Sequence, residues 1–244
     1  MQKHDQASSL SAQDLAAVQR QHQGRSVLEG LKIVAVLGLI LAFAGVLAVA
    51  TIPSNGWEIG LVTGLSWLVG ASGVLWFFRD APPQPAAERG VILSPAHGTI
   101  DYIDISNETR FLHGPARRIS IYLSLLNVHV QHAPVSGTVE VLQHFPGRWS
   151  RAIRRDSSLR NEHLLVGLTS GEGRKIAIRM ISGIWVRRIV PWIACGQRVT
   201  GGERIGLIRF GSRVDVFLPL DAHVNVSPGD RVRGGQTILG RFEQ

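Results

Sequence analysis

The sequence predicts a mainly β domain that follows a pair of membrane-spanning helices, and three observations carry this prediction. Two uncharged apolar runs of about twenty residues lie close together in the first third of the chain. Beyond residue 90 the chain alternates apolar and polar residues over short stretches separated by glycine turns, which is the pattern of β-strands. Two glycine-rich segments there also resemble each other, as in lipoyl-like and hybrid-barrel hairpin units.

The two apolar runs, 33–51 and 59–78, are each long enough to cross about 30 Å of hydrocarbon as a helix. The connector "IPSNGWE" is so short that the helices are expected to form a hairpin with both ends on one side. The alternative is a pair of buried helices in a soluble protein. Basic residues flank the outer ends while the connector holds only Glu58, so the positive-inside rule favours the cytoplasm for both termini. We therefore expect an anchor in the cell (inner) membrane, with the β domain on its cytoplasmic side.

The chain divides by composition into four parts: a polar N-terminal arm (1–28), the helical hairpin (29–78), a proline-rich linker (79–90) and a β domain (91–244). The last part has enough residues for a real hydrophobic core. Within it, "RRISIYLSLL" and "RKIAIRMI" alternate as strands do, and "TSGEGRKI" predicts a hairpin turn. The two similar glycine segments begin at Gly196 and Gly229, an offset of 33 residues.

Net charge and cysteine content limit which binding partners and cysteine-based sites we expect. The net charge is +8 and is almost wholly due to arginine, which beside a membrane hairpin favours an anionic lipid surface over a nucleic acid. The single cysteine, Cys195, excludes an internal disulfide and a thiolate metal site. A basic segment from 146 to 162 is either a solvated loop or a surface that lies on lipid headgroups. Its candidate lipid-contacting residues are Arg148, Trp149, Arg151, Arg154 and Arg155.

Two features could carry chemistry. His129 and His132 lie three residues apart before a proline turn, and histidine is the side chain best suited to move protons near neutral pH; either is also common as a structural residue. A zinc site would need more convergent ligands, so no metal is expected. The second feature is Gly211-Ser212 inside the strand-like stretch "GLIRFGSRVDVFLPL". A serine hydroxyl after glycine can attack the preceding carbonyl, and the resulting ester can eliminate to leave an N-terminal pyruvoyl group.

Seven motifs occur in the order found in the short, membrane-anchored branch of the phosphatidylserine decarboxylase proenzymes, and the chain resembles that family from about 77 to 240. They are "FFRD", "ILSPAHG", "LNVHVQHAPVSG", "PGRW", "NE" at 161–162, "RRIVPWI" and "GERIGLIRFGSRVDVFLP". The resemblance implies self-cleavage between Gly211 and Ser212 into a large β chain (1–211) and a small α chain (212–244) that begins with pyruvoyl. It further implies that this group, with no metal, decarboxylates phosphatidylserine to phosphatidylethanolamine, and that His129 and His132 serve processing and catalysis.

One departure from the family pattern concerns self-cleavage. The usual "SPADG" aspartate, which orients the activating histidine, is replaced here by His97, so the fixed negative charge is lost. Cleavage could be slower, recruit Asp101 or Asp104, or fail. The alternatives to the enzyme are an unprocessed homologue that binds anionic lipid, and an acyl or biotinyl carrier using Lys175. The precise lipid and any homo-oligomer stay open at this point.

Overall fold

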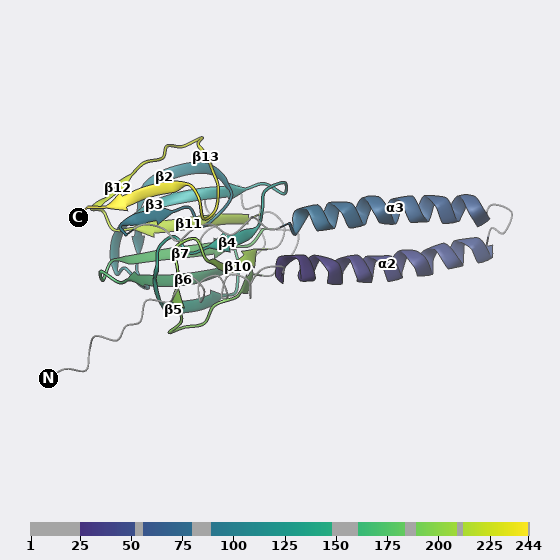
Figure 1. The fold of residues 1–244 in the computed structure, drawn as a ribbon, viewed down its shortest axis with the longest axis horizontal. Coiled ribbons are helices and arrows are strands. Elements are labelled where there is room, and N and C mark those ends of the chain that lie inside the picture. Colours follow the sequence, from purple (N-terminus) through teal and green to yellow (C-terminus); the bar gives the residue numbers. More distant parts are fainter. Residues whose placement is uncertain are drawn as a thin grey trace.

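The computed structural model describes residues 25–51, 56–79, 89–147, 161–183, 189–208 and 212–243. Two long helices, α2 (Arg25–Thr51) and α3 (Gly56–Phe77), lie side by side and project from one end of a β domain (Figure 1). The C-terminal end of the chain lies at the opposite end of that domain (Figure 1). The predicted fold class, a mainly β domain after a helical hairpin, is confirmed.

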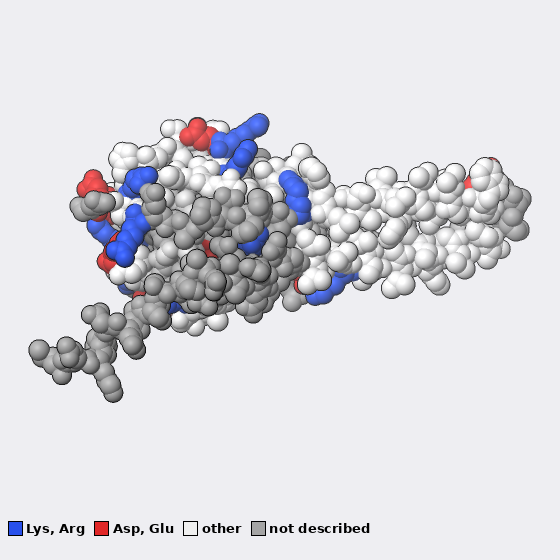
Figure 2. Space-filling view, in the orientation of Figure 1, with Lys and Arg blue, Asp and Glu red and all other residues white. Residues whose placement is uncertain are grey.

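The hairpin has the properties of a membrane-associated element. Both helices are long and apolar enough to cross a bilayer, and almost none of their length is buried inside the molecule, unlike a core helix of a soluble protein. Glycines let the helices approach closely: a Cβ on Gly38 would lie 2.7 Å from Trp67 Nε1, and one on Gly45 would lie 3.3 Å from Thr63 Cγ2. In Figure 2 the visible hairpin is almost free of charge, and lysine and arginine atoms appear at its base.

The β domain is built on one large antiparallel sheet of eight strands. Their order is β13 (Arg231–Val232), β2 (Gly98–Glu108), β3 (Gly114–Leu123), β11 (Ser212–Leu218), β7 (Lys175–Ile181), β6 (His163–Ser170), β5 (Gly137–Phe145), β9 (Arg198–Val199). The period-two stretches form β3 and β7. The predicted hairpin turn joins β6 to β7, where Ser170 N donates to Arg174 O at 2.8 Å.

Two small sheets of three strands complete the domain. One has the order β1 (Val91–Leu93), β14 (Ile238–Phe242), β12 (Ala222–Val224), and the other has the order β4 (Val130–His132), β10 (Arg204–Ile208), β8 (Ile189–Pro191). The main hydrophobic core draws residues from all three sheets, among them Ile121, Ile208 and Leu239. β4 and β10 lie at the end of the domain that faces the helices (Figure 1).

The two similar glycine segments form matching structural units. Each has a short strand, β9 or β13, that pairs with the first residues of a long strand, β5 or β2. Each has a turn glycine with positive φ, +85° at Gly202 and +70° at Gly235, a conformation that glycine adopts without strain. The amide of Gly202 donates to Ala133 O and that of Gly235 donates to Ser94 O. The two similar sequence segments therefore share the same turn, the same kind of strand pairing and the same backbone hydrogen bond.

The stretch around position 212 differs from one interrupted strand. Extended backbone is present on both sides, as β10 and β11, but these strands belong to different sheets. The chain therefore changes sheets between Ile208 and Ser212. Within β11 the side chains of Val214, Val216 and Leu218 join the main core, while Arg213 and the residues alternating with it face the other side of the large sheet.

Candidate active site

Ser212 is the first residue of β11 and already takes part in the pairing of that strand with β3. Its Cα pairs with that of Leu123 at the end of β3. The residue is fully buried, and its Oγ has no hydrogen-bond partner among the described residues. A buried hydroxyl without a partner costs free energy, so this atom is one for which the fold alone gives no structural role.

Two short chain segments bring His129 to the same corner of the domain. Ile208 N donates to His129 O at 3.2 Å, and Ile208 is four residues before Ser212, which is at most about 14 Å of extended chain. From Leu123, opposite Ser212, a tight turn leads to His129. In that turn the backbone amide and the Oγ of Ser124 both donate to Asn127 Oδ1, at 2.8 and 2.7 Å. The end of β10, the start of β11 and His129 therefore share one region.

His129 is arranged as a neutral base. Its Nδ1 lies 2.8 Å from the carbonyl oxygen of Asn127, which can only accept, so Nδ1 carries the proton. Its Nε2 then has a free lone pair, and this buried atom has no partner among the described residues. Burial, with a further contribution from the positive charge of Arg79, lowers the pKa of His129 to about 4. The ring is thus uncharged and able to accept a proton at neutral pH.

His132 and His97 form a second pair of rings in the same cluster. Their centroids are 5.9 Å apart in an edge-to-face arrangement, and a Cβ on Gly234 would lie 2.8 Å from His132 Nδ1 and 3.0 Å from His97 Cδ2. Burial is the main cause that lowers the pKa of His132 to about 3 and that of His97 to about 4. The charge of His97 contributes to the lowered pKa of both other histidines, so His97 lies within electrostatic range of each.

The two aspartates considered as substitutes for the charge missing at position 97 are both bound by arginines in the structure. Asp101 accepts a hydrogen bond from Arg213 at 2.7 Å, and Asp104 binds Arg118 through two bonds of 2.9 and 2.6 Å. Each aspartate is therefore held by an arginine here, and its recruitment to the histidines stays a prediction. Three arginines lie in electrostatic range of the histidines instead: Arg79, Arg204 and Arg233. The uncharged histidines therefore have positively charged neighbours.

The end of α3 packs directly on this site. The ring of Phe77 lies 4.3 Å from that of His129, and both Phe77 and Phe78 share a small apolar cluster with Val130 and Leu207 of β4 and β10. Arg79, just after the helix, donates to the backbone oxygens of Trp76 and Leu126. The candidate site is thus next to the base of the hairpin. The motif "FFRD" contained these residues, but only the three-dimensional structure shows that they contact the histidine.

The structure places His97 and His132 in ring contact and His129 within electrostatic range of His97. It pairs Ser212 with Leu123, which leads into the turn before His129, and the roles of all four residues stay predictions. Gly211 and the arginine-tryptophan group at 148, 149, 151, 154 and 155 lie outside the described residues. Asn161 has a structural role, because its side chain donates to Ser182 O at 2.9 Å. The described residues contain no group of three or more His, Cys, Asp or Glu side chains placed to hold a metal ion.

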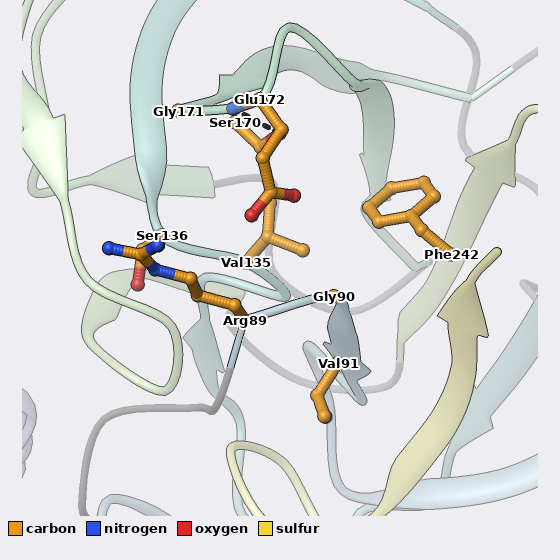
Figure 3. A pocket seen from close by; sticks show the side chains of 9 residues that line it. All are labelled: Arg89, Gly90, Val91, Val135, Ser136, Ser170, Gly171, Glu172 and Phe242. Atoms are coloured by element: carbon orange, nitrogen blue, oxygen red, sulfur yellow. Dashed lines mark hydrogen bonds between the residues drawn. The ribbon is translucent and has the colours of Figure 1, made fainter. Parts of the chain in front are cut away.

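A separate cavity of about 160 Å³ is lined by none of these residues. Figure 3 shows Arg89 and Glu172 projecting toward it from different segments, with the ring of Phe242 beside them. It lies at the start of β1 and the turn between β6 and β7. This cavity is therefore distinct from the serine and histidine cluster.

Fold and site together define a class: a membrane-associated β-domain protein with a buried serine beside uncharged histidines. Comparison with known proteins identifies the family. The family model described as phosphatidylserine decarboxylase matches residues 71–240. A phosphatidylserine decarboxylase proenzyme of Desulfotalea psychrophila is 39% identical over 204 residues, which cover 82% of this chain and 93% of the relative. One from Symbiobacterium thermophilum is 40% identical over 189 residues, covering 77% and 86%. The chain belongs to the phosphatidylserine decarboxylase family.

Proposed function

We propose that this protein decarboxylates phosphatidylserine to phosphatidylethanolamine with a pyruvoyl group made from its own Ser212. Family membership supports the reaction, and the names of its relatives as proenzymes support processing. The single observation that carries the mechanism is the buried Oγ of Ser212, which has no hydrogen-bond partner among the residues that the structure describes. Ser212 begins a strand in the corner that contains His129. A hydroxyl that stabilises nothing in the folded chain is available for reaction.

Self-cleavage begins when Ser212 Oγ adds to the carbonyl carbon of Gly211 and the amide nitrogen leaves as an amine. His129 Nε2, uncharged and without a partner among the described residues, accepts the hydroxyl proton. Elimination then removes the Cα proton of residue 212 and breaks its Cβ–Oγ bond, so that the large chain (1–211) leaves with a new carboxylate and a Cα–Cβ double bond forms. Water replaces the remaining nitrogen, ammonia departs, and the small chain (212–244) is left with an N-terminal pyruvoyl. The atoms balance with one water consumed and one ammonia released.

The residues around position 212 fit such a group. When present, it supplies an electron sink for loss of carbon dioxide from an amine bound to it. β11 pairs with β3 on one side and with β7 on the other, and both pairings include Arg213. A new chain end at residue 212 therefore stays in place. Arg213 is itself fully buried and donates to Ser120 Oγ at 2.6 Å and Asp101 Oδ2 at 2.7 Å. These bonds anchor the residue next to the reacting position.

The position of the site also suits a membrane lipid. The hairpin base contacts His129 through Phe77, and the arginines near the histidines provide positive charge for a phosphate-bearing headgroup. We place the catalytic β domain (91–244) on the cytoplasmic side of the cell membrane, after a polar arm (1–28), the spanning hairpin (29–78) and a linker (79–90). The basic 148–155 segment is proposed to face lipid headgroups.

A second candidate function is an unprocessed homologue that only binds anionic lipid. The observation that favours it is His97, because no carboxylate among the described residues hydrogen-bonds to the histidine cluster. Release of carbon dioxide from phosphatidylserine vesicles separates the two functions. If the protein is the decarboxylase, we expect the unaltered protein to release carbon dioxide and Ser212→Ala to release none. The matched variant Ser106→Ala in β2 is expected to keep full activity. An intact protein that binds these vesicles but releases no carbon dioxide would support the lipid-binding function instead.

A further inference from the structure

Two adjacent leucines are exposed on the β domain at the place where the hairpin joins it. Leu125 and Leu126 occupy the turn between β3 and β4 and are 49% and 72% exposed. Leu126 is the most exposed large apolar side chain in the described part of the β domain; Ile105 in β2 follows at 65%. Single exposed apolar residues are common on soluble surfaces, but an adjacent pair beside a membrane helix is a different case.

Contacts fix this turn at the level where the hairpin ends. The Arg79 guanidinium donates both to Trp76 O in the last turn of α3 and to Leu126 O. The same guanidinium lies 4.4 Å from the ring centroid of Trp76, which is 59% exposed. Tryptophan and arginine are typical of the interface between hydrocarbon and water. The leucine pair therefore continues the apolar surface of the helix onto the β domain.

The turn is braced by hydrogen bonds and is adjacent to the candidate site. Asn127 holds it from inside, through the Ser124 bonds described above and a bond from Asn127 N to Ser124 O at 3.0 Å. It is entered from Leu123, the partner of Ser212, and leaves through the Asn127 carbonyl that orients His129. Any surface that receives the leucines thus lies next to both reacting residues.

We propose that the Leu125-Leu126 turn inserts into the interfacial layer of the phospholipid bilayer and presents the Ser212 site to headgroups of the same leaflet. The occupant is a bilayer because the exposed pair is continuous with two helices whose length and apolar surface already fit one. Inserting the leucines removes apolar surface from water and lets a lipid reach the site without leaving the membrane. The role in substrate access rests on the proposed decarboxylase function; the insertion itself does not.

The first test measures insertion without using activity. Full-length protein with Cys195→Ser, needed because Cys195 is exposed, carries Leu126→Cys or Ile105→Cys labelled with a nitroxide, in phosphatidylcholine vesicles with phosphatidylserine. The proposal predicts that the label at 126 collides more with oxygen and the label at 105 more with a water-soluble nickel complex. Equal exposure of both labels to the nickel complex would overturn it. So would spin–spin broadening at 126, which would indicate a second copy of the chain.

The second test measures access to the site. Leu125→Ser with Leu126→Ser is expected to lower kcat/KM on vesicle phosphatidylserine about tenfold, with unchanged self-cleavage by intact mass and a rate within about twofold on a soluble short-chain substrate. The control Ile105→Ser changes neither substrate's rate. An equal loss on both substrates, or no loss on vesicles, contradicts the access role. If the unaltered protein showed neither cleavage nor activity, the proposed function would be wrong. The nitroxide measurement would still show whether the leucine turn inserts into the bilayer.

Discussion

Replacing His97 by aspartate is expected to accelerate self-cleavage, because it returns a negative charge to the histidine cluster. The rings of His97 and His132 are 5.9 Å apart. At about 6 Å and an effective dielectric constant of about 20, a carboxylate stabilises an imidazolium by about 3 kcal/mol, or about two pKa units. The pKa of His132, held at about 3 by burial and neighbouring positive charge, then rises. The ring is still uncharged at pH 7 but is a stronger base.

His97 also lowers the pKa of His129, the base proposed for self-cleavage, so the same replacement makes that ring a stronger base and gives a measurable rate. If the logarithm of the proton-transfer rate rises by about half of the change in pKa, two pKa units speed cleavage of His97→Asp at pH 7 about tenfold. The assay follows the intact masses of freshly synthesised protein over time between pH 5 and 8. His223→Asp, on exposed β12, is the matched control and leaves the rate unchanged. Equal or slower cleavage in His97→Asp beside an unchanged control would refute the electrostatic reasoning.

Three further predictions concern the packing of the site. The pKa of His129 is about 4 in the folded chain against 6.5 as a reference, so between these pH values the unfolded state binds a proton that the folded state does not. The free energy of unfolding therefore falls by about 3 kcal/mol as the pH is lowered from 6.5 to 4. In His129→Gln, urea unfolding is expected to lack this part of the pH dependence. Gly234→Ala pushes a methyl group into the histidine pair and slows self-cleavage, whereas Gly114→Ala, with nothing within 4 Å, leaves the cleavage time course as it is. Arg213→Met removes a fully buried guanidinium and its ion pair with the 37% exposed Asp101, and it takes a neighbouring positive charge from the buried carboxyl of Asp215. The free energy of unfolding is expected to fall by about 3 kcal/mol, measured in uncleaved protein; a loss below about 1 kcal/mol would contradict that.

Local patterns predicted the elements of this fold, because each pattern depends on neighbouring residues alone. The charge-free runs gave α2 and α3, and the isoleucine alternation gave β3 and β7. Sheet membership is different, since it depends on which distant strand supplies the hydrogen bonds. The stretch through Gly211-Ser212 alternates like one strand, yet β10 pairs with β4 and β8 while β11 pairs with β3 and β7. No feature within the fifteen residues shows that change of sheet.

The candidate site was predictable as a set of residues but not as an arrangement. Ser212, His129 and His97 stand out in the sequence, while the proximity of His97 to His132 depends on turns tied by the amides of Gly235 and His132. Asp101 was a reasonable substitute for the missing carboxylate. A register shift between Ile100 and Tyr102 interrupts the pairing of β2 with β3, and Asp101 accepts a bond from Arg213. A bulge of this kind cannot be read from alternation alone.

The most direct test of the central claim is the intact mass of the purified full-length protein. We expect two chains, 1–211 and 212–244, with the smaller beginning in a ketone that reacts with a hydrazide reagent. In Ser212→Ala the protein stays as one chain. A single chain in the unaltered protein after long incubation, with Ser212 unmodified, would contradict the claim that this serine is the source of the catalytic group.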